Sequence, residues 1–243
     1  MGKRIRVQRR GRGGPAYRAS THKRIAPVQY PSPDKIQQGA VQATIETIIH
    51  EPGRGAPLTK IRLHTGQQYH SIAPEGIYEG QTIQIGDQAP VQIGNILPLK
   101  KIPEGTMICD IELQVGDGGK IARSSGTYAT LVSHTPQGTM IKFPSGKTKY
   151  INPLCRATIG IVSAAGRLDK PLLKAGKKYH LKKAKGHKYP RTRGRAMVAA
   201  VHPYGSSGKG GRKVTTVSRG APPGQKVGLI AARSAGRKRK KRR

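Results

Sequence analysis

The chain has 243 residues, and its 46 Lys and Arg side chains against 11 Asp and Glu give a formal net charge of +35. This excess indicates a polyanionic partner, because unneutralised repulsion on such a scale destabilises a compact protein. No apolar run approaches the ~20 residues of a membrane span, and no apolar segment follows the basic N-terminus, so we predict neither a membrane protein nor a signal peptide. The two cysteines, Cys109 and Cys155, are too isolated for a disulfide framework or a zinc site and fit a reducing cytosol.

The charge is unevenly distributed along the chain. Residues 1–35 hold ten basic and one acidic side chain, residues 36–165 hold eleven and nine, and residues 166–243 hold twenty-five and one. A nearly neutral centre can fold around an apolar core, whereas arms rich in Gly and Lys bury too little apolar surface to offset their ordering entropy. We therefore predict a folded centre with two polycationic arms that order on their partner.

The first arm and the first β lobe differ in residue composition and pattern. In residues 1–35 Gly, Pro and Arg are too dense for helical or strand periodicity, which predicts an extended, unpacked tail. From Gly39 onward, short β-branched runs alternate with turn residues. The predicted strands are residues 41–49, 58–63, 69–73 and 82–85, and they form an all-β lobe within residues 36–92.

A second series of strands follows within residues 93–175. Residues 106–113 alternate, so that Cys109 lies on an apolar face opposite Asp110 and Glu112, and we predict that Cys109 belongs to the core. Further strands are predicted at residues 127–133, 140–143, 147–151 and 157–162, spaced as in a small barrel. Residues 176–243 are predicted to be an extended basic extension.

Residues 145–148 predict a hairpin turn instead of a phosphate site. Their sequence Ser-Gly-Lys-Thr looks like the end of a phosphate-binding loop, but the glycine required five positions before Gly146 is Ile141, and strand patterns flank the turn. The eight histidines show no spacing typical of metal ligands. We predict no metal and no cofactor.

The polycationic arms are the strongest functional signal in the sequence. Each Lys or Arg that neutralises a phosphate releases a counterion, so RNA affinity should fall by roughly 0.7 to 0.9 log units per contact per log unit of salt. A DNA-compacting protein is an alternative that shares the arms but lacks the β lobes. Four tyrosines beside cations either stack on exposed bases or pack locally: Tyr17, Tyr179, Tyr189 and Tyr204.

His202 is the one residue for which catalysis is conceivable. A histidine near neutral pKa in an RNA assembly can shuttle protons or donate to a phosphate. Its neighbours in the sequence offer no carboxylate to orient the ring, and no nucleophile and base are grouped elsewhere. We therefore predict no catalytic residue and no enzyme, with His202 in a positioning or RNA-contacting role.

Seven collinear segments are similar to a known family. They are IIHEPGRGAPLTKI (48–61), GNILPL (94–99), GDGGKIARSSGTYATLVSH (116–134), CRATIGIV (155–162), DKPLLKAGKKYH (169–180), RGRAM followed by HP (193–203) and APPGQKVGLIAAR (221–233). With these segments the chain resembles the ribosomal protein L-two family of the large subunit, in its archaeal and eukaryotic-cytosolic form.

The resemblance implies an all-β fold with an oligonucleotide-binding (OB) barrel followed by an SH3-like barrel and extended basic tails at both ends. It implies a structural constituent of the large ribosomal subunit in the cytoplasm. Such a protein is a primary rRNA binder that supports subunit association, tRNA binding and the architecture around the peptidyl transferase centre. The implied partners are large-subunit rRNA, other ribosomal proteins and, through an intersubunit bridge, small-subunit rRNA, without a membrane or a homo-oligomer.

The resemblance also implies particular RNA contacts. Two RNA-contacting arginines of the family fall on Arg54 in the PGRGAP turn and Arg123 in the KIARSSG loop, where a guanidinium fork can grip phosphate. Arg156 of CRATIG is a third candidate. In the C-terminal extension the expected rRNA-binding residues are Lys177, Lys178, Arg191, Arg193, His202, Lys209, Arg212, Arg219, Lys226 and Arg233.

The sequence departs from the family pattern around His202. Where the pattern is RGxAMNPVDHPxGGG, this chain has RGRAMVAAVHPYGSSG, with Val201 in place of an aspartate. A family histidine proposed to assist peptide-bond formation falls on His202, and the missing carboxylate argues against that chemistry here. The family's AGGGR loop is Ala164-Ala165-Gly166-Arg167, which adds a β-carbon where RNA would approach.

Overall fold

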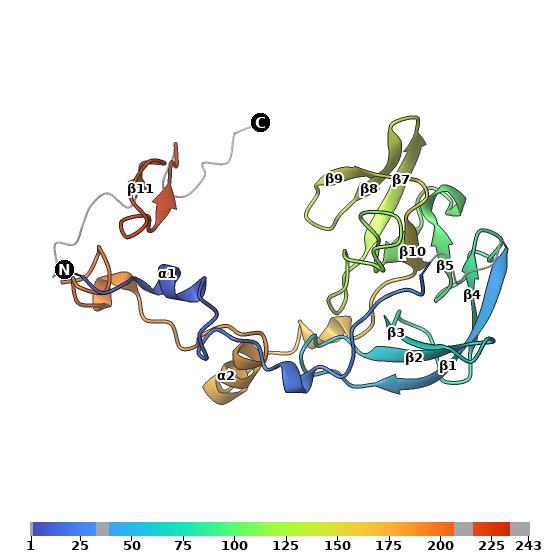
Figure 1. Ribbon diagram of the computed structural model, residues 1–243, viewed down its shortest axis with the longest axis horizontal. Coiled ribbons are helices and arrows are strands. Elements are labelled where there is room, and N and C mark those ends of the chain that lie inside the picture. Colours follow the sequence, from blue (N-terminus) through green and yellow to red (C-terminus); the bar gives the residue numbers. More distant parts are fainter. Residues whose placement is uncertain (1, 33–38, 207–215, 234–243) are drawn as a thin grey trace. The chain divides into compact units, whose positions relative to one another are not determined.

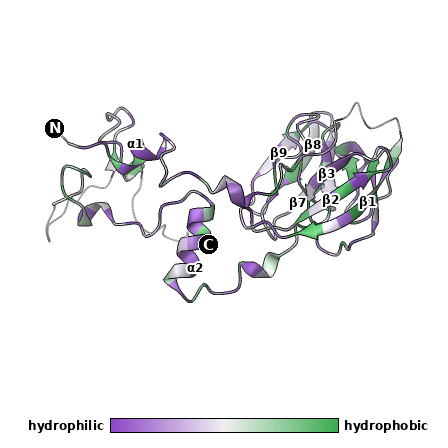
Figure 2. Ribbon diagram, turned by 60° about the horizontal axis from the view of Figure 1, so that its bottom comes forward, coloured by the Kyte–Doolittle hydropathy of each residue, from purple (hydrophilic) through white to green (hydrophobic). Residues whose placement is uncertain are grey.

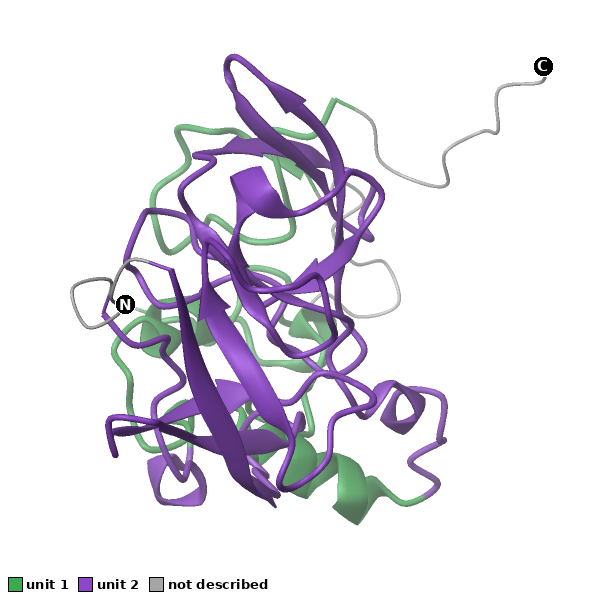
Figure 3. Ribbon diagram, turned by 90° about the vertical axis from the view of Figure 1, so that its right-hand side faces the viewer, with its two compact units in different colours: residues 1–19, 174–243 green, residues 20–173 purple. Residues whose placement is uncertain are grey.

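The computed structural model describes residues 2–32, 39–206 and 216–233 (Figure 1). The chain divides into two compact units, one of residues 20–173 and one of residues 1–19 together with 174–243 (Figure 3). The two units are called the larger and the smaller unit below. None of the described helices is long and apolar enough to cross a membrane.

The larger unit is built on one β-sheet, whose ten strands among the described residues run in the order β3-β2-β1-β4-β5-β10-β6-β7-β8-β9. The strands are β1 (Ala40–Ile49), β2 (Leu58–Leu63), β3 (Gln68–Ile72), β4 (Thr82–Gly86), β5 (Ile96–Pro98), β6 (Met107–Cys109), β7 (Ala129–Thr135), β8 (Gly138–Lys142), β9 (Thr148–Ile151) and β10 (Arg156–Ile159). Neighbouring strands are antiparallel except β4 and β5, which run parallel and pair through Ile85 and Ile96. Short 3-10 turns occur at η1 (Thr21–Lys23), η3 (Leu99–Lys101) and η4 (Ala165–Arg167).

Two apolar cores fill the two halves of this sheet. In the first half of β1 every second side chain is buried, because successive side chains of a strand face opposite sides. Figure 2 shows hydrophobic residues in the strands of this sheet. The first core contains Val41, Ala43, Ile45, Ile61, Leu63, Ile83, Ile85 and Ile96. The second contains Leu97, Leu99, Ile102, Ile108, Ile111, Leu131, Ile141 and Ala157. The fold is all-β, an OB-fold barrel followed by an SH3-like barrel, as predicted.

A third apolar cluster joins the two barrels. It combines Ala56, Leu58 and Ile72 of the OB barrel with Cys109 and Val162 of the SH3-like barrel, and Val28 from the N-terminal arm completes it. The expectation of an unpacked tail is therefore wrong for residues 26–32, where Val28 and Tyr30 are only 3% and 5% exposed. Prolines at positions 27 and 31 hide the strand-like alternation of this stretch in the sequence.

The alternation expected over residues 106–113 is only partly right. Cys109 is fully buried, as predicted. The strand stops there, because Asp110 adopts a φ of 47°, and both Asp110 and Glu112 are fully buried instead of facing away from the core. Buried carboxylates persist when a cation pairs with them, and a pattern of neighbouring residues carries no sign of such a distant partner.

The other strands lie close to their predicted positions. The strand expected at residues 58–63 has those bounds, and the turn at Ser145 and Gly146 is a hairpin between β8 and β9, in which Gly146 N donates to Phe143 O. The short strand β5 was missed, because three residues are too few for a period.

The smaller unit contains more regular structure than an extended tail. It has helices α1 (Arg6–Arg10) and α2 (Ala175–Ala184), the 3-10 turn η5 (Gly194–Ala196), and a parallel pair β11 (Thr216–Val217) and β12 (Leu229–Ile230). Helix α2 is almost wholly exposed except for Ala184. It is followed by Gly186 at φ +69°, where a β-carbon would lie 2.7 Å from Tyr17 O, so only glycine allows the two ends of the chain to approach this closely.

Candidate nucleic-acid interface

The smaller unit carries positive charge without any carboxylate to balance it. Residues 1–19 hold seven Lys and Arg and residues 174–243 hold twenty-three, while neither stretch contains an Asp or Glu. The larger unit, by contrast, has sixteen basic and eleven acidic side chains. Because no side chain of the smaller unit can neutralise its cations, their counter-charge must come from a partner or from solution ions.

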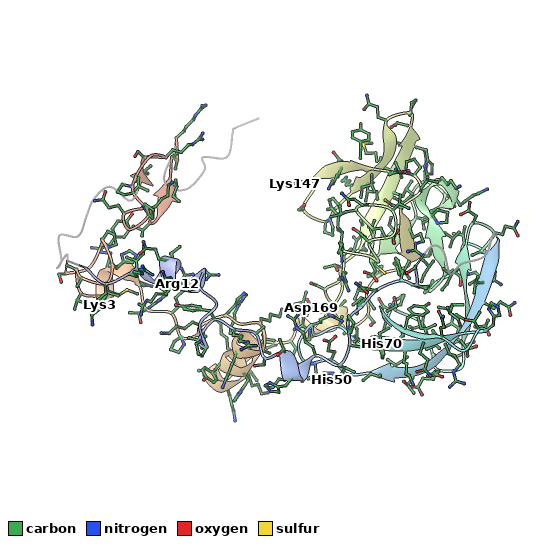
Figure 4. The ribbon with its side chains drawn as sticks, viewed as in Figure 1. Lys3, Arg12, His50, His70, Lys147 and Asp169 are labelled. Carbon is green, nitrogen blue, oxygen red and sulfur yellow. The ribbon has the colours of Figure 1, made fainter. Side chains whose placement is uncertain are left out.

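The two ends of the chain are joined within the smaller unit. Lys3 N donates to Ala200 O at 2.8 Å, and Arg6 Nη1 donates to Thr192 O at 3.2 Å. Ile5 is 5% exposed, which shows that the N-terminal arm packs here as well as hydrogen-bonds. Figure 4 shows the side chains of this unit, with Lys3 and Arg12 labelled. These contacts bring cations of α1 beside cations of residues 187–193.

A cavity of about 290 Å³ lies among these cations, and we call it the tyrosine pocket. Its aromatic lining consists of Tyr17 and Tyr189, both half-buried. Its polar lining consists of Arg6, Arg10, Lys182, His187, Lys188 and Arg191. An aromatic face between cationic side chains is the arrangement that accepts an unpaired base and its phosphates.

A second cavity of about 340 Å³, the histidine pocket, shares Arg6 and Arg191 with the first. Its lining includes Ile5, Arg193 and His202. Since two arginines line both cavities, a bound strand that passes from one to the other would keep the same cations beside its backbone.

The geometry of His202 fits a positioning role. Its Nδ1 accepts a hydrogen bond from Tyr204 N at 3.1 Å, and the two rings meet edge to face with centroids 5.1 Å apart. A β-carbon at Gly194 would overlap the imidazole, so this glycine makes room for the ring. Burial, and then the charge of Arg6, lower the pKa of His202 and favour the neutral imidazole. Among the described residues no carboxylate contacts the ring.

The structure places the other predicted residues of the extension on its surface. Lys177 and Lys178 are exposed on α2, and Lys178 Nζ lies 5.4 Å from the centroid of the Tyr189 ring. Arg191 and Arg193 are exposed beside the two pockets. Arg219, Lys226 and Arg233 flank β11 and β12, and only Lys226 among them is half-buried. Lys209 and Arg212 lie outside the described residues.

The three arginines predicted in the barrels are engaged inside the larger unit. Arg54 and Arg123 each donate to a backbone carbonyl of the N-terminal arm and pair with a carboxylate, and Arg156, 7% exposed, does the same. Contact of these three residues with rRNA stays a prediction.

Asp110 is the most perturbed carboxyl group of this region. Burial raises its pKa to about 7, against the opposing effect of the nearby Arg123 and Arg54 guanidinium groups. Arg123 Nε lies 3.2 Å from Asp110 Oδ1 but without hydrogen-bond alignment, and neither carboxylate oxygen accepts a hydrogen bond among the described residues. Burial likewise raises the pKa of Glu51, whose Oε2 pairs with Arg54.

Sequence reasoning missed part of this interface. Arg6, Arg10, Lys182, His187 and Lys188 line the tyrosine pocket, but they are spread over two arms and share no motif. The signal that could have found them is the absence of any Asp or Glu from residues 1–19 and 174–243.

Among the described residues no group of His, Cys, Asp and Glu is arranged to hold a metal ion.

Comparisons with known proteins agree along the length of the chain. Residues 3–85 match the family model Ribosomal Proteins L2, RNA binding N-terminal domain, and residues 92–226 match Ribosomal Proteins L2, C-terminal domain. The large ribosomal subunit protein uL2 of Korarchaeum cryptofilum is 50% identical over 99% of this chain and 98% of its own. The proteins of the same name from Pyrobaculum calidifontis and Methanobrevibacter smithii are 52% and 48% identical, each over 98% of this chain and over 96% and 100% of their own.

The two β-barrels, the acid-free basic extension and these matches define the chain as a ribosomal protein. Within that class it belongs to the family of Ribosomal Proteins L2.

Replacing Asp110 by Asn should change how stability depends on pH. Because the pKa of Asp110 is raised to about 7 from its ordinary value of 3.8, the carboxyl group binds its proton more tightly in the folded protein than in the unfolded chain. The stabilisation by the protonated group is complete below its unfolded pKa and is lost as the pH rises through about 7. The neutral amide of Asp110→Asn cannot lose a proton in this way.

The measurement is urea unfolding of both proteins at several pH values. The free energy of unfolding of the parent, minus that of Asp110→Asn, should fall by about 2 kcal/mol between about pH 5 and about pH 8. A difference that stays constant over this range would show that the carboxyl group is already ionised in the fold at the lower pH.

Proposed function

We propose that this protein is a structural, rRNA-binding constituent of the large ribosomal subunit. The observation that carries the proposal is the smaller unit, whose sequence holds thirty Lys and Arg and no Asp or Glu, and whose aromatic pocket is lined by Arg6, Arg10, Lys182, Lys188 and Arg191. The names of the relatives, which are large ribosomal subunit proteins, and the RNA-binding description of the N-terminal family model support it.

Binding proceeds mainly by charge neutralisation. Lys and Arg of the smaller unit replace the counterions condensed on rRNA, and the released ions make affinity strongly dependent on salt. Unpaired bases stack on Tyr17 or Tyr189 in the tyrosine pocket, while Arg191 and Arg6 face the adjoining phosphates. His202, Arg193, Lys177, Lys178, Arg219, Lys226 and Arg233 extend the same basic surface, and we assign Lys209 and Arg212 to it from the sequence alone.

The proposal extends to the roles that the family resemblance implies. In the ribosome the protein would support subunit association and tRNA binding, and it would stabilise the architecture around the peptidyl transferase centre. Its further partners would be other ribosomal proteins and small-subunit rRNA at an intersubunit bridge. The protein has no catalytic role of its own in this proposal, because the ring of His202 accepts a hydrogen bond from Tyr204 N and no carboxylate of the described residues contacts it.

Replacing Arg191 by Gln should weaken binding to large-subunit rRNA and reduce its salt dependence. Filter binding over a series of salt concentrations should give a slope of log affinity against log salt that is smaller by about 0.7 to 0.9. The matched control is Arg62→Gln on β2, which removes one charge from a guanidinium that is 58% exposed and paired with Glu46. Equal salt slopes for the two variants would count against the smaller unit as the interface. Equal affinity of the parent protein for duplex DNA and for rRNA would favour a DNA-compacting protein instead.

Replacing Tyr189 by Leu should weaken rRNA binding without changing the salt slope. Leu keeps an apolar side chain but has no π face, and stacking on a base is worth about 1–3 kcal/mol. Tyr189→Phe is the matched control, because it keeps the ring and should bind like the parent protein. If Leu and Phe bind equally well, then Tyr189 serves local packing, the other role open to it from the sequence.

Replacing His202 by Gln should leave the rate of peptide-bond formation unchanged in ribosomes that assemble normally. Gln retains a polar group that can accept the Tyr204 N–H hydrogen bond but cannot exchange a proton near neutral pH. The rate should be measured across pH with purified subunits that carry the variant. A pH-dependent loss of rate in fully assembled particles would restore an acid–base role for this residue.

A further inference from the structure

A stretch of the N-terminal arm lies in the seam between the two barrels, and three arginines hold its backbone. Arg54 Nη2 donates to Ala26 O at 3.2 Å, Arg123 Nη2 to Val28 O at 2.8 Å, and Arg156 Nη1 to Pro31 O at 2.8 Å. We call residues 24–32 the seam segment. Figure 1 shows it in blue, ahead of β1, passing beside β3.

Each of the three guanidinium groups also lies beside a buried carboxylate. Arg54 Nη1 lies 3.0 Å from Glu51 Oε2, Arg123 Nε lies 3.2 Å from Asp110 Oδ1, and Arg156 Nη2 lies 2.7 Å from Glu112 Oε1. One edge of the planar fork is held by the carboxylate in Arg54 and Arg156, and by Gly119 O, which accepts from Nη1 at 2.9 Å, in Arg123. Another edge therefore points at the carbonyl of the seam segment. A lysine ammonium, as a point charge, cannot occupy both positions at once.

The seam segment contacts both barrels by its own groups as well. Gln29 N donates to His70 O of β3 in the OB barrel, and Tyr30 N donates to Gly118 O of the SH3-like barrel. His70 is labelled on the larger unit in Figure 4. The Tyr30 hydroxyl lies 2.6 Å from both Asp110 O and Thr158 Oγ1, and Val28 fills the apolar cluster shared by the barrels. The seam segment therefore ties one barrel to the other.

Direct contact with RNA would disrupt this arrangement. All three side-chain nitrogens of Arg156 donate within the chain, and the Arg54 and Arg123 side chains are about one-fifth exposed. If a guanidinium turned towards a phosphate, it would leave a fully buried carboxylate without its cation, which is strongly unfavourable. The geometry favours a role inside the protein over one at its surface.

We infer that Arg54, Arg123 and Arg156 are positioning residues that hold the seam segment between the barrels, so that the two barrels meet rRNA as one rigid body. They affect RNA binding through the seam segment and not by touching RNA themselves. The RNA measurement below rests on the proposed function, whereas the hydrogen-exchange measurement does not.

The first test uses the full-length protein without RNA. In Arg123→Lys, amide hydrogen exchange at Gln29 and Tyr30 should rise at least about tenfold over the parent, since a charge-assisted hydrogen bond that holds the neighbouring carbonyl is lost. Arg62→Lys is the matched control and should leave both amides as in the parent. Unchanged exchange at Gln29 and Tyr30 in Arg123→Lys would overturn the inference.

Amides of β8, within the SH3-like core, report whether the variant is folded. If the β8 amides have lost their protection in Arg123→Lys, the test is repeated with Arg54→Lys, at the more exposed end of the seam segment. Exchange at Gln29 and Tyr30 should rise in that variant as well, and unchanged exchange would overturn the inference.

The second test separates positioning from contact. Arg123→Lys and Arg123→Gln should weaken rRNA binding alike, by about tenfold, with the salt slope of the parent. A direct phosphate contact predicts instead that Lys binds nearly as the parent does, while Gln reduces the slope by about 0.7 to 0.9, and this result would overturn the inference. If the parent itself does not bind rRNA, the proposed function fails, and the exchange measurement still decides the role of the seam segment.

Discussion

Opposite charges are separated along this chain, and most of the structure follows from that separation. All eleven carboxylates lie in residues 20–173, where they face sixteen cations, and none lies among the thirty cations of the smaller unit. The larger unit can therefore satisfy its buried charges internally and close two apolar cores. Among the described residues, the smaller unit has short elements and contacts between the two ends of the chain, and its cations need a counter-charge from a partner or from solution ions.

The same separation gives arginine two different roles in one protein. In the larger unit, Glu51, Asp110 and Glu112 lie beside arginines, so these guanidinium groups are paired within the protein. In the smaller unit, arginines such as Arg191 have no carboxylate nearby and face an open pocket. The residue type alone thus does not predict an RNA contact, and in our proposal the presence or absence of a nearby carboxylate distinguishes the two roles.

Much of the larger unit could be predicted from the sequence, because β-branched runs between turn residues are a local signal. The strand at Leu58–Leu63 and the hairpin at Gly146 are examples. Helix α2 was missed, since it is polar on all sides and lacks the apolar stripe that marks a packed helix. The helix is followed by the close approach of Gly186 to Tyr17, a contact between residues far apart in the sequence.

The candidate site was predictable in its chemistry but not in its geometry. The cations of the extension and the tyrosines beside them were identified in the sequence, whereas the tyrosine pocket needs Arg6 and Arg10 from the other end of the chain. The burial of Asp110 and Glu112 was hidden for the same reason, because their partners Arg123 and Arg156 lie 13 and 44 residues further along. Pairings over such separations leave no periodic trace in a single sequence.

The places of the two cysteines make them reporters of how the larger unit opens. Cys109 lies in the cluster shared by the barrels and Cys155 in the core of the second barrel, and burial raises the pKa of both thiols, that of Cys155 to about 11. Because the thiolate is the reactive form, neither sulfur is open to alkylation until its surroundings separate. The chain has no Trp, so tryptophan fluorescence cannot report on this opening. Alkylation of Cys109 before Cys155 would mark barrels that part while each stays folded, and simultaneous labelling would mark cooperative unfolding of the whole sheet.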